Sequence, residues 1–121
     1  MNKQDLQNCA PKIFILQSYK LCGAFPRNAA GFETAKQLIR SAGSVGANYR
    51  AACRGKSKAD FIYKIEIVVE EADESLYWLE VAKEAVLVPA VSDIDVLMKE
   101  ANELGSIFNA TDITAKKNKN K

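Results

Sequence analysis

The sequence predicts an all-α protein that folds as an antiparallel up-down four-helix bundle. Four segments carry apolar residues at intervals of three and four, which is the period of an amphipathic helix. Short connections between these segments place consecutive helices side by side and antiparallel. Only three prolines and six glycines occur among 121 residues, and this scarcity favours long helices. Hydrophobic residues make up 48% of the chain, which is enough for a packed core.

The first helix is expected over residues 5–24. Pro11 either kinks this helix or lies in the first turn of a shorter helix that starts near Ala10. A helix with an irregular start is the favoured interpretation. Phe25 precedes Pro26 and is driven out of the α region, which ends the helix. Its predicted apolar stripe consists of Leu6, Cys9, Ile13, Leu16 and Tyr19.

The second helix is expected from the N-cap Asn28 to Arg54. Gly55 then supplies the left-handed residue that ends helices, and Ser57 caps the next helix with Asp60 three residues on. The turn is therefore only a few residues long, so the second and third helices must pack antiparallel. The predicted stripe of the second helix is Ala35, Leu38, Ala42, Val45, Tyr49 and Ala52.

The third helix is expected over residues 58–86, where Pro89 follows and breaks the pattern. The fourth begins at a second Ser-x-x-Asp signal, Ser92 to Asp95, and fades near 111–115. Residues 1–115 therefore form the bundle, and residues 116–121 are expected to be a basic, disordered tail. The predicted stripes are Phe61, Ile65, Val68, Ala72, Leu76, Leu79 and Val86 in the third helix, and Ile94, Leu97, Ala101, Leu104 and Phe108 in the fourth.

Charge is segregated along the chain, although the formal net charge is only +2. Residues 27–64 hold eight Lys and Arg against two acids, a net of +6. Residues 65–103 hold eleven acids against two Lys, a net of −9. Such asymmetry is typical of an intramolecular clasp, a self-association surface or a basic docking face.

The composition argues against catalysis and against a bound cofactor. The chain has no histidine, which is the commonest general base and metal ligand. No glycine-rich phosphate loop is present, and Gly43 and Gly46 are interpreted as small residues that let two helices approach closely. A solvated acidic face is expected rather than a carboxylate metal site, since di-iron bundles use Glu-x-x-His motifs. The acids in question are Glu66, Glu70, Asp73 and Glu74.

A cytoplasmic location without membrane insertion is expected. No apolar stretch approaches the ~20 residues that a membrane span needs, and no secretory signal begins the chain. The three cysteines are odd in number and scattered, which predicts reduced thiols in the protein core: Cys9, Cys22 and Cys53.

A cluster of cations spans the turn between the second and third helices: Arg50, Arg54, Lys56, Lys58 and Lys64. Several of these side chains would project from one end of the bundle, which is a candidate surface for phosphates. The alternative is a solvated end, in which Arg50 and Arg54 complement the dipole at the end of the second helix.

The fold-back around Lys56 also predicts a register between the two helices. Residues at equal height have numbers that sum to about 112, which brings Arg40 near residue 72. We therefore expect Arg40 to form an ion pair with Glu71 or Glu74, with a solvent-facing Arg40 as the alternative.

Three segments of the chain match a known pattern: 37–50 (QLIRSAGSVGANYR), 54–61 (RGKSKADF) and 71–79 (EADESLYWL). They resemble the signature of the four helix bundle protein family, also called the S23 or 23S rRNA-intervening-sequence protein family. The resemblance implies bacterial origin and a ring-like homopentamer of up-down bundles. Some members are encoded within intervening sequences of ribosomal RNA genes, and most have no assigned function. The family commonly has glutamate three residues after Asn48, where this chain has Ala51.

The resemblance also links the chain to a protein related to this family, the accessory variability determinant of diversity-generating retroelements. That protein binds nucleic acid and a reverse transcriptase. The first function hypothesis is thus a homo-oligomeric accessory protein that binds RNA or DNA. The second is an oligomeric scaffold for a protein partner, such as a reverse transcriptase, without nucleic acid. Both include self-association, which the surplus of aromatic residues outside the stripes also favours: Phe32, Tyr63, Tyr77 and Trp78.

Overall fold

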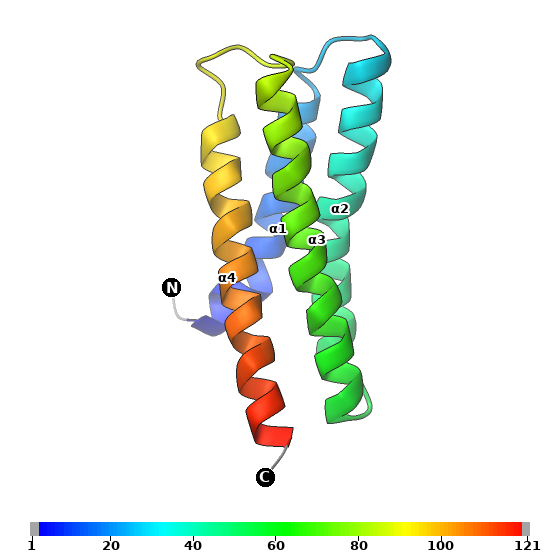
Figure 1. Cartoon of the computed structure of the whole chain (residues 1–121), viewed down its shortest axis with the longest axis vertical. Helices are drawn as coiled ribbons and strands as arrows, with labels where there is room; N and C mark the ends of the chain where they lie inside the picture. The colour runs from blue at the N-terminus through cyan, green and yellow to red at the C-terminus, as the bar shows by residue number, and fades with distance from the viewer. Residues whose placement is uncertain (1–2, 120–121) are drawn as a thin grey trace.

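The computed structural model describes residues 3–119, and side chains from residue 9 to residue 118. It contains four helices: α1 (Lys3–Cys22), α2 (Ala29–Cys53), α3 (Lys58–Glu84) and α4 (Ile94–Lys119). They run alternately up and down, so that the α2–α3 turn and the C-terminus lie at one end of the bundle (Figure 1). The predicted all-α, antiparallel four-helix architecture is confirmed. None of the described helices is long and apolar enough to cross a membrane.

Helices α2 and α3 both begin at the predicted capping residues. The Asn28 side chain accepts a hydrogen bond from Gly31 N at 2.9 Å, and that of Ser57 accepts one from Asp60 N at 3.1 Å. The conformation expected at Gly55 is wrong, because no described glycine has a positive φ. A Cβ atom at Gly55 would lie 2.3 Å from Asp60 Oδ2, so a larger residue would displace this carboxylate.

The left-handed residue of the fold is Val86, with φ = 55°. Leu87 N donates to Ala82 O at 2.9 Å and Val86 N donates to Lys83 O at 3.1 Å, the two bonds of a Schellman motif. Val86 was expected on the apolar face of the third helix, but it lies beyond the helix end with a side chain 78% exposed. A β-branched residue in this conformation is strained.

Helix α1 differs from the prediction in the face that it buries. Pro11, Phe14, Ser18 and Leu21 face the bundle, and the predicted stripe lies outside, with Leu16 62% exposed. The Ser18 hydroxyl donates to Phe14 O at 2.8 Å, which lets a polar residue occupy a buried position. Leu6 lies outside the described side chains. Cys9 is exposed, and so is Cys53, which corrects the expectation that both are core residues.

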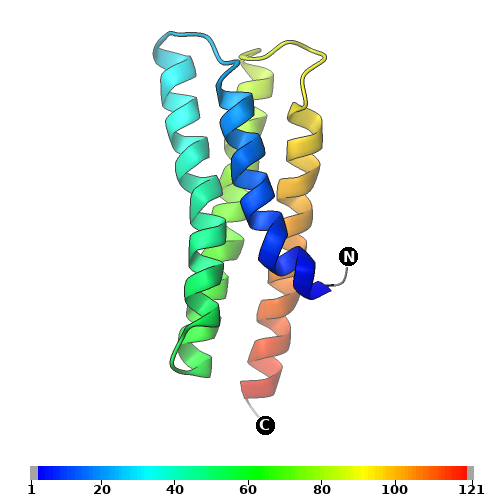
Figure 2. The same cartoon turned by 180° about the vertical axis from the view of Figure 1, so that it is seen from behind.

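Pro11 lies inside α1 and does not start a shorter helix. Figure 2 shows the first turns of α1 bending away from the axis of the rest, as a proline that removes a backbone hydrogen bond allows. Gly43 and Gly46 of α2 face this helix: Cβ atoms there would lie 3.7 Å from Ile15 Cδ1 and 3.3 Å from Pro11 Cβ. The predicted role of these glycines in close helix approach is thereby confirmed.

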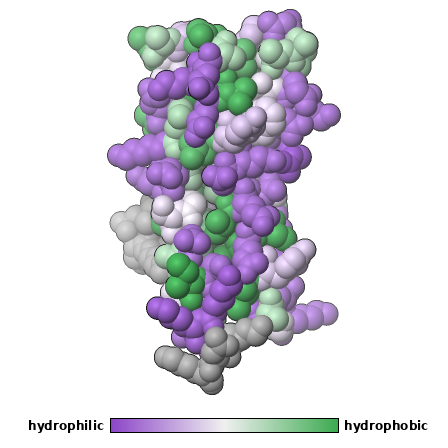
Figure 3. Space-filling view, in the orientation of Figure 1, coloured by the Kyte–Doolittle hydropathy of each residue, from purple (hydrophilic) through white to green (hydrophobic). Residues whose placement is uncertain are grey.

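The core is built from the predicted stripes of α2, α3 and α4, apart from Val86, together with Phe14 and other residues of α1 and the loops. A buried polar contact joins two of these helices, because the Ser75 hydroxyl donates to Ser41 Oγ at 3.0 Å. Hydrophilic side chains cover most of the face in Figure 3. The largest fully buried hydrophobic residues are Phe14, Leu38, Val45, Ile65, Val68, Leu79, Leu97 and Phe108.

Helix α4 is longer than predicted. It begins at Ile94, directly after Asp93 rather than after Ser92, and it continues to Lys119. The segment 116–119 is therefore helical and not a disordered tail. Lys116 Nζ lies 2.9 Å from Glu66 Oε1 of α3 and 3.0 Å from Asp112 Oδ2, and these contacts tie the last turns to the bundle. Residues 120–121 lie outside the described part of the chain.

Candidate nucleic-acid interface

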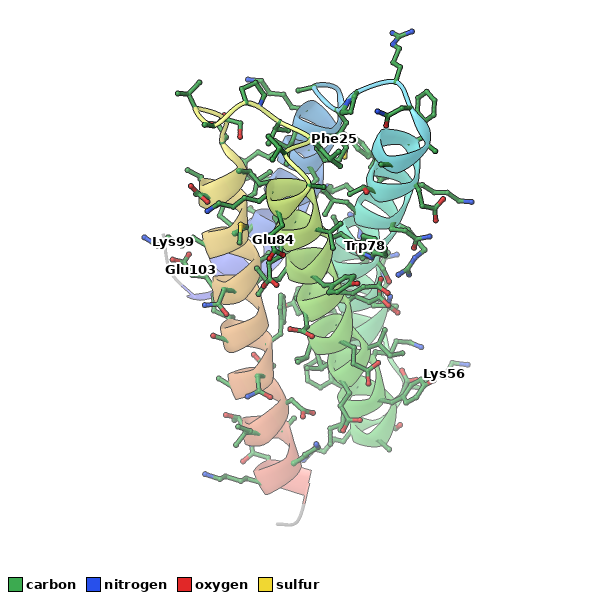
Figure 4. All side chains as sticks on the ribbon, turned by 45° about the horizontal axis from the view of Figure 1, so that its top comes forward. Phe25, Lys56, Trp78, Glu84, Lys99 and Glu103 are labelled. Carbon is green, nitrogen blue, oxygen red and sulfur yellow. The ribbon has the colours of Figure 1, made fainter. Side chains whose placement is uncertain are left out.

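Four of the five predicted cations gather at the end of the bundle that holds the α2–α3 turn. Arg50 lies in the last turn of α2, Arg54 is its C-cap, Lys56 lies in the turn and Lys58 begins α3. All four side chains are exposed, and none forms an ion pair with any residue that the structure describes. In Figure 4, Lys56 projects from the end of the bundle opposite to Phe25.

The fifth predicted cation, Lys64, has a different environment. Its Nζ lies 3.6 Å from Asp60 Oδ1, one helical turn earlier on α3, and the side chain is half-buried. The carboxylate of Asp60 offsets much of this charge. Lys64 therefore contributes less positive potential to the end of the bundle than the other four residues.

Helix α4 adds cations that sequence reasoning assigned to the tail. Lys117 is exposed, whereas hydrogen bonds to Glu66 and then to Asp112 raise the pKa of Lys116. Asp112 is buried, and its Oδ1 atom has no hydrogen-bond partner among the described residues. The helical period of Phe108, Asp112 and Ala115 was the signal that could have extended the predicted helix to these lysines.

A cavity of about 810 Å³ opens between the α2–α3 turn and the last turns of α4. Helix α1 does not cover this end, because its N-terminal turn lies well above the α2–α3 turn in both views (Figures 1 and 2). The Tyr49 ring packs against Phe108 with a centroid distance of 5.0 Å, and forms part of the cavity floor. The lining residues include Tyr49, Lys56, Lys58, Phe61, Thr111 and Asn118.

A second hollow of about 610 Å³ lies beside the first, between α1 and α2. Arg50 and Arg54 line it together with Pro11, Lys12 and Gly46. Cys53 borders both hollows. The four exposed cations thus surround two adjacent concave surfaces rather than a flat end.

The predicted ion pair lies apart from this end, near the middle of α2 and α3. Arg40 Nη1 donates to Glu71 Oε2 at 3.2 Å, and Nη2 contacts Glu74 Oε2. Arg40 bridges both candidate acids, with its side chain 49% exposed. The buried Ser41–Ser75 hydrogen bond lies one residue further along each helix from the Arg40 and Glu74 contact. This cluster joins α2 and α3 at equal height and thereby supports their register.

Other reactive groups do not converge on a site. Within the described chain no group of three or more His, Cys, Asp or Glu residues is arranged to hold a metal ion. The three cysteines are free thiols, and burial raises the pKa of Cys22 to about 11. Burial raises the pKa of Glu100, and the neighbouring Glu103 adds to this effect.

The position where the family pattern has glutamate lies on α2, three residues after Asn48. Asn48 Nδ2 donates to Ser44 O at 2.9 Å and to Ser44 Oγ at 2.7 Å, so its amide is engaged within its own helix. Ala51 offers no polar group of its own. The interface described above therefore does not depend on a residue at that position.

The fold and this end define a class: small up-down four-helix bundles with one exposed basic end. The sequence matches the 23S rRNA-intervening sequence protein family over residues 11–110. The chain belongs to that family.

One solved structure illustrates the relationship. It is a protein of unknown function from the S23 ribosomal protein family of Bacteroides thetaiotaomicron VPI-5482. The two chains are 26% identical with a TM-score of 0.82, and the alignment covers 92% of this chain and 98% of that one. No curated protein matches the sequence.

Proposed function

We propose that this protein is a homo-oligomeric, cytoplasmic accessory protein that binds nucleic acid and performs no catalysis. The observation that carries the proposal is the set of four exposed cations at one end of the bundle. Arg50, Arg54, Lys56 and Lys58 have no ion-pair partner among the described residues, so their charge is available to phosphates. Each phosphate neutralised by such a side chain releases counterions, which drives association.

The separation of charge along the bundle supports this proposal, because carboxylates repel phosphates. Glu84 and Glu103 lie far from Lys56 (Figure 4), whereas the acids nearer the basic end are paired with Lys64 or Lys116: Asp60, Glu66 and Asp112. Lys58 and Glu84 are the two ends of α3, which at 27 residues is roughly 40 Å long. That separation exceeds the Debye length of ~8 Å at physiological salt several-fold, so the two ends act independently.

Binding of mixed-sequence RNA and DNA at ~50 mM salt tests the proposal. We expect weak, sequence-independent binding whose affinity falls steeply as salt increases. The triple variant Arg54→Gln, Lys56→Gln, Lys58→Gln should weaken it. The matched control, Lys20→Gln, Lys36→Gln, Lys99→Gln, removes the same charge from exposed positions on other parts of the bundle and should bind nearly as the parent does. Absence of binding to either nucleic acid would reject the proposal.

Exposed apolar residues support the oligomeric part of the proposal. Ile13, Leu16 and Tyr19 form an uncovered stripe on α1, and three of the four surplus aromatics are exposed as well. Sedimentation at micromolar concentration should give a species several times the 13.3 kDa of one chain, and a pentamer is the proposed state. Leu16→Glu should dissociate it, whereas the exposed neighbour Gln17→Glu should not. A monomer for the parent protein would contradict this part.

The same apolar surface favours a second candidate, an oligomeric scaffold for a protein partner such as a reverse transcriptase. A scaffold would keep its assembly and would lack the salt-dependent binding. An oligomer that binds neither RNA nor DNA at ~50 mM salt would therefore favour the scaffold.

A further inference from the structure

We propose that the cavity between the α2–α3 turn and the end of α4 binds a nucleotide of a single-stranded nucleic acid, with its base on the aromatic floor and its phosphate on Lys56 and Lys58. The inference rests on the proposed function and specifies the form of nucleic acid that this end selects. The observation that carries it is the presence of aromatic side chains and lysines around one open cavity of about 810 Å³.

The size and the floor of the cavity suit a base. Its volume falls within the ~300–1,000 Å³ that is usual for small-molecule sites. Phe61 is partly exposed and packs against the core, so it offers a ring face to the cavity, while Tyr49 is 8% exposed and lies beneath it against Phe108 at 5.0 Å. A fixed aromatic ring provides a stacking surface for any base, because every base has a π face.

The rim of the cavity suits a phosphate. Lys56 and Lys58 line the cavity and flank Ser57, whose side chain caps the positive N-terminal end of the 27-residue helix α3. The opposite wall, on α4, carries Asn118, an amide that can both donate to and accept from a base edge. Aromatic rings, cations and an amide thus line one cavity.

The arrangement distinguishes single strands from duplexes. Bases in a duplex are stacked and paired, so their faces cannot enter a cavity without an unstacking cost. A duplex can therefore use only the lysines and arginines at the rim, through its phosphates. An acidic peptide can also use the cations, but it gains nothing from the aromatic floor.

Phe61→Leu tests the role of the floor, because it keeps an apolar side chain on the core and removes the ring. We expect affinity for a single-stranded 12-residue RNA or DNA to fall at least about fivefold, the lower end of the loss per stacked base. Affinity for a hairpin duplex of equal phosphate number should be unchanged. Tyr63→Leu is the matched control, since Tyr63 lies two residues away on α3, is exposed and does not line the cavity.

Ala115→Phe provides an independent variant that fills the cavity from the α4 wall without altering α3. It should weaken single-strand binding as Phe61→Leu does, whereas Ala110→Phe, at an exposed α4 position outside the lining, should not. Circular dichroism and thermal unfolding establish that each variant is folded. If Phe61→Leu does not fold, the comparison of Ala115→Phe with Ala110→Phe tests whether the cavity binds single strands.

Cys53 reports occupancy of the cavity directly, because it lines the cavity and is exposed. Its alkylation by iodoacetamide should slow when a single-stranded oligonucleotide is added, while that of Cys9, exposed on α1, should not. Cys22 should react slowly throughout, since burial raises its thiol pKa to about 11.

The outcomes separate this inference from the proposed function. If the triple charge variant weakens binding while Phe61→Leu and Ala115→Phe bind single strands like the parent, the cavity assignment is wrong and the proposed function stands. Equal inhibition of parent and Phe61→Leu binding by a poly-glutamate peptide, with no preference for single strands, would overturn the inference in favour of an acidic peptide ligand. No binding of any nucleic acid would reject both.

Discussion

Helix α1 and the α2–α3 pair are held in the same bundle by different interactions. Helices α2 and α3 share a capped turn, the Arg40 ion pairs and the Ser41–Ser75 hydrogen bond. The described side chains of α1, from residue 9 to residue 22, make no hydrogen bond or ion pair to another helix. Helix α1 packs through shape, with Pro11 and Ile15 against Gly46 and Gly43. Polar contacts thus define the register of one region, and close packing positions the other.

The comparison also explains how the molecule divides its surfaces. Because α1 does not reach the α2–α3 turn, it leaves the basic end and its cavity uncovered (Figures 1 and 2). Because α1 buries a narrow face, its apolar residues Ile13, Leu16 and Tyr19 remain outside. The length and the buried face of α1 therefore determine which of these surfaces are open to partners.

The largest effect is expected from truncating the buried face of α1. Phe14→Ala should lower the free energy of unfolding by about 3–5 kcal/mol, because Phe14 is fully buried. Leu16→Ala should change it by no more than ~0.5 kcal/mol within one protomer, because Leu16 is exposed. Denaturant unfolding at two protein concentrations measures both and separates assembly effects. Equal losses for the two variants at both concentrations would show that the face assigned to α1 is wrong.

The next effect concerns the C-terminal end of α3. This end has a strained residue, Val86, whereas the α2–α3 turn is well capped. Val86→Gly should raise the free energy of unfolding by about 1 kcal/mol, because glycine adopts a positive φ without steric cost. Val91→Gly is the control: Val91 is also an exposed loop residue but has a negative φ, so the change should not stabilise. Thermal unfolding compares the two, and equal shifts would contradict the strain at Val86.

Two glycines of α2 test the packing of α1 by shape. Gly43→Ala should stabilise by ~0.5–1 kcal/mol through helix propensity, since a Cβ there lies at an ordinary 3.7 Å from Ile15. Gly46→Ala should raise the free energy of unfolding by less than Gly43→Ala, or lower it, because its Cβ would lie 3.3 Å from Pro11 Cβ. Denaturant unfolding measures both. A Gly46→Ala gain as large as that of Gly43→Ala would show that α1 moves easily.

The smallest effect concerns the polar contacts between α2 and α3. In a double-mutant cycle, Arg40→Met and Glu71→Gln should show a coupling of ~0.2–1 kcal/mol, because Arg40 is half-exposed. The coupling should decrease as salt rises. Glu74→Gln provides a second cycle for the other carboxylate. Strictly additive effects in both cycles would show that these ion pairs do not stabilise the helix pair.

The α2–α3 region was largely predictable from the sequence. Asn28 and Ser57 are caps whose geometry is local, and the starts of both helices and the end of α2 followed within a residue, while α3 ends two residues before its predicted end. Because the turn is short, residues of α2 and α3 at equal height have numbers with a constant sum. This register correctly predicted that Arg40 lies beside Glu71 and Glu74. Local rules suffice here because every contact involved depends on one turn and one helical period.

The face of α1 was not predictable in the same way. Its apolar residues occur around the helix, and the polar Ser18 occupies a core position because its hydroxyl bonds to Phe14 O. A hydrophobic pattern cannot show that a serine is buried and a leucine exposed. The end of α4 was missed for a similar reason, since a lysine-rich segment is held by Glu66, distant in the sequence.

The sequence by itself determined the number of helices, their order and direction, and the concentration of cations around the α2–α3 turn, because these depend on residue spacing and local capping. The tertiary structure decided the orientation of α1, the left-handed conformation at Val86 and the cavity floored by Tyr49 and Phe61. These features depend on how far one helix extends beside the others and on which residues fill the space between them. Neither the extent of a helix beside its neighbours nor the packing between helices can be predicted from the hydrophobic period of a single helix.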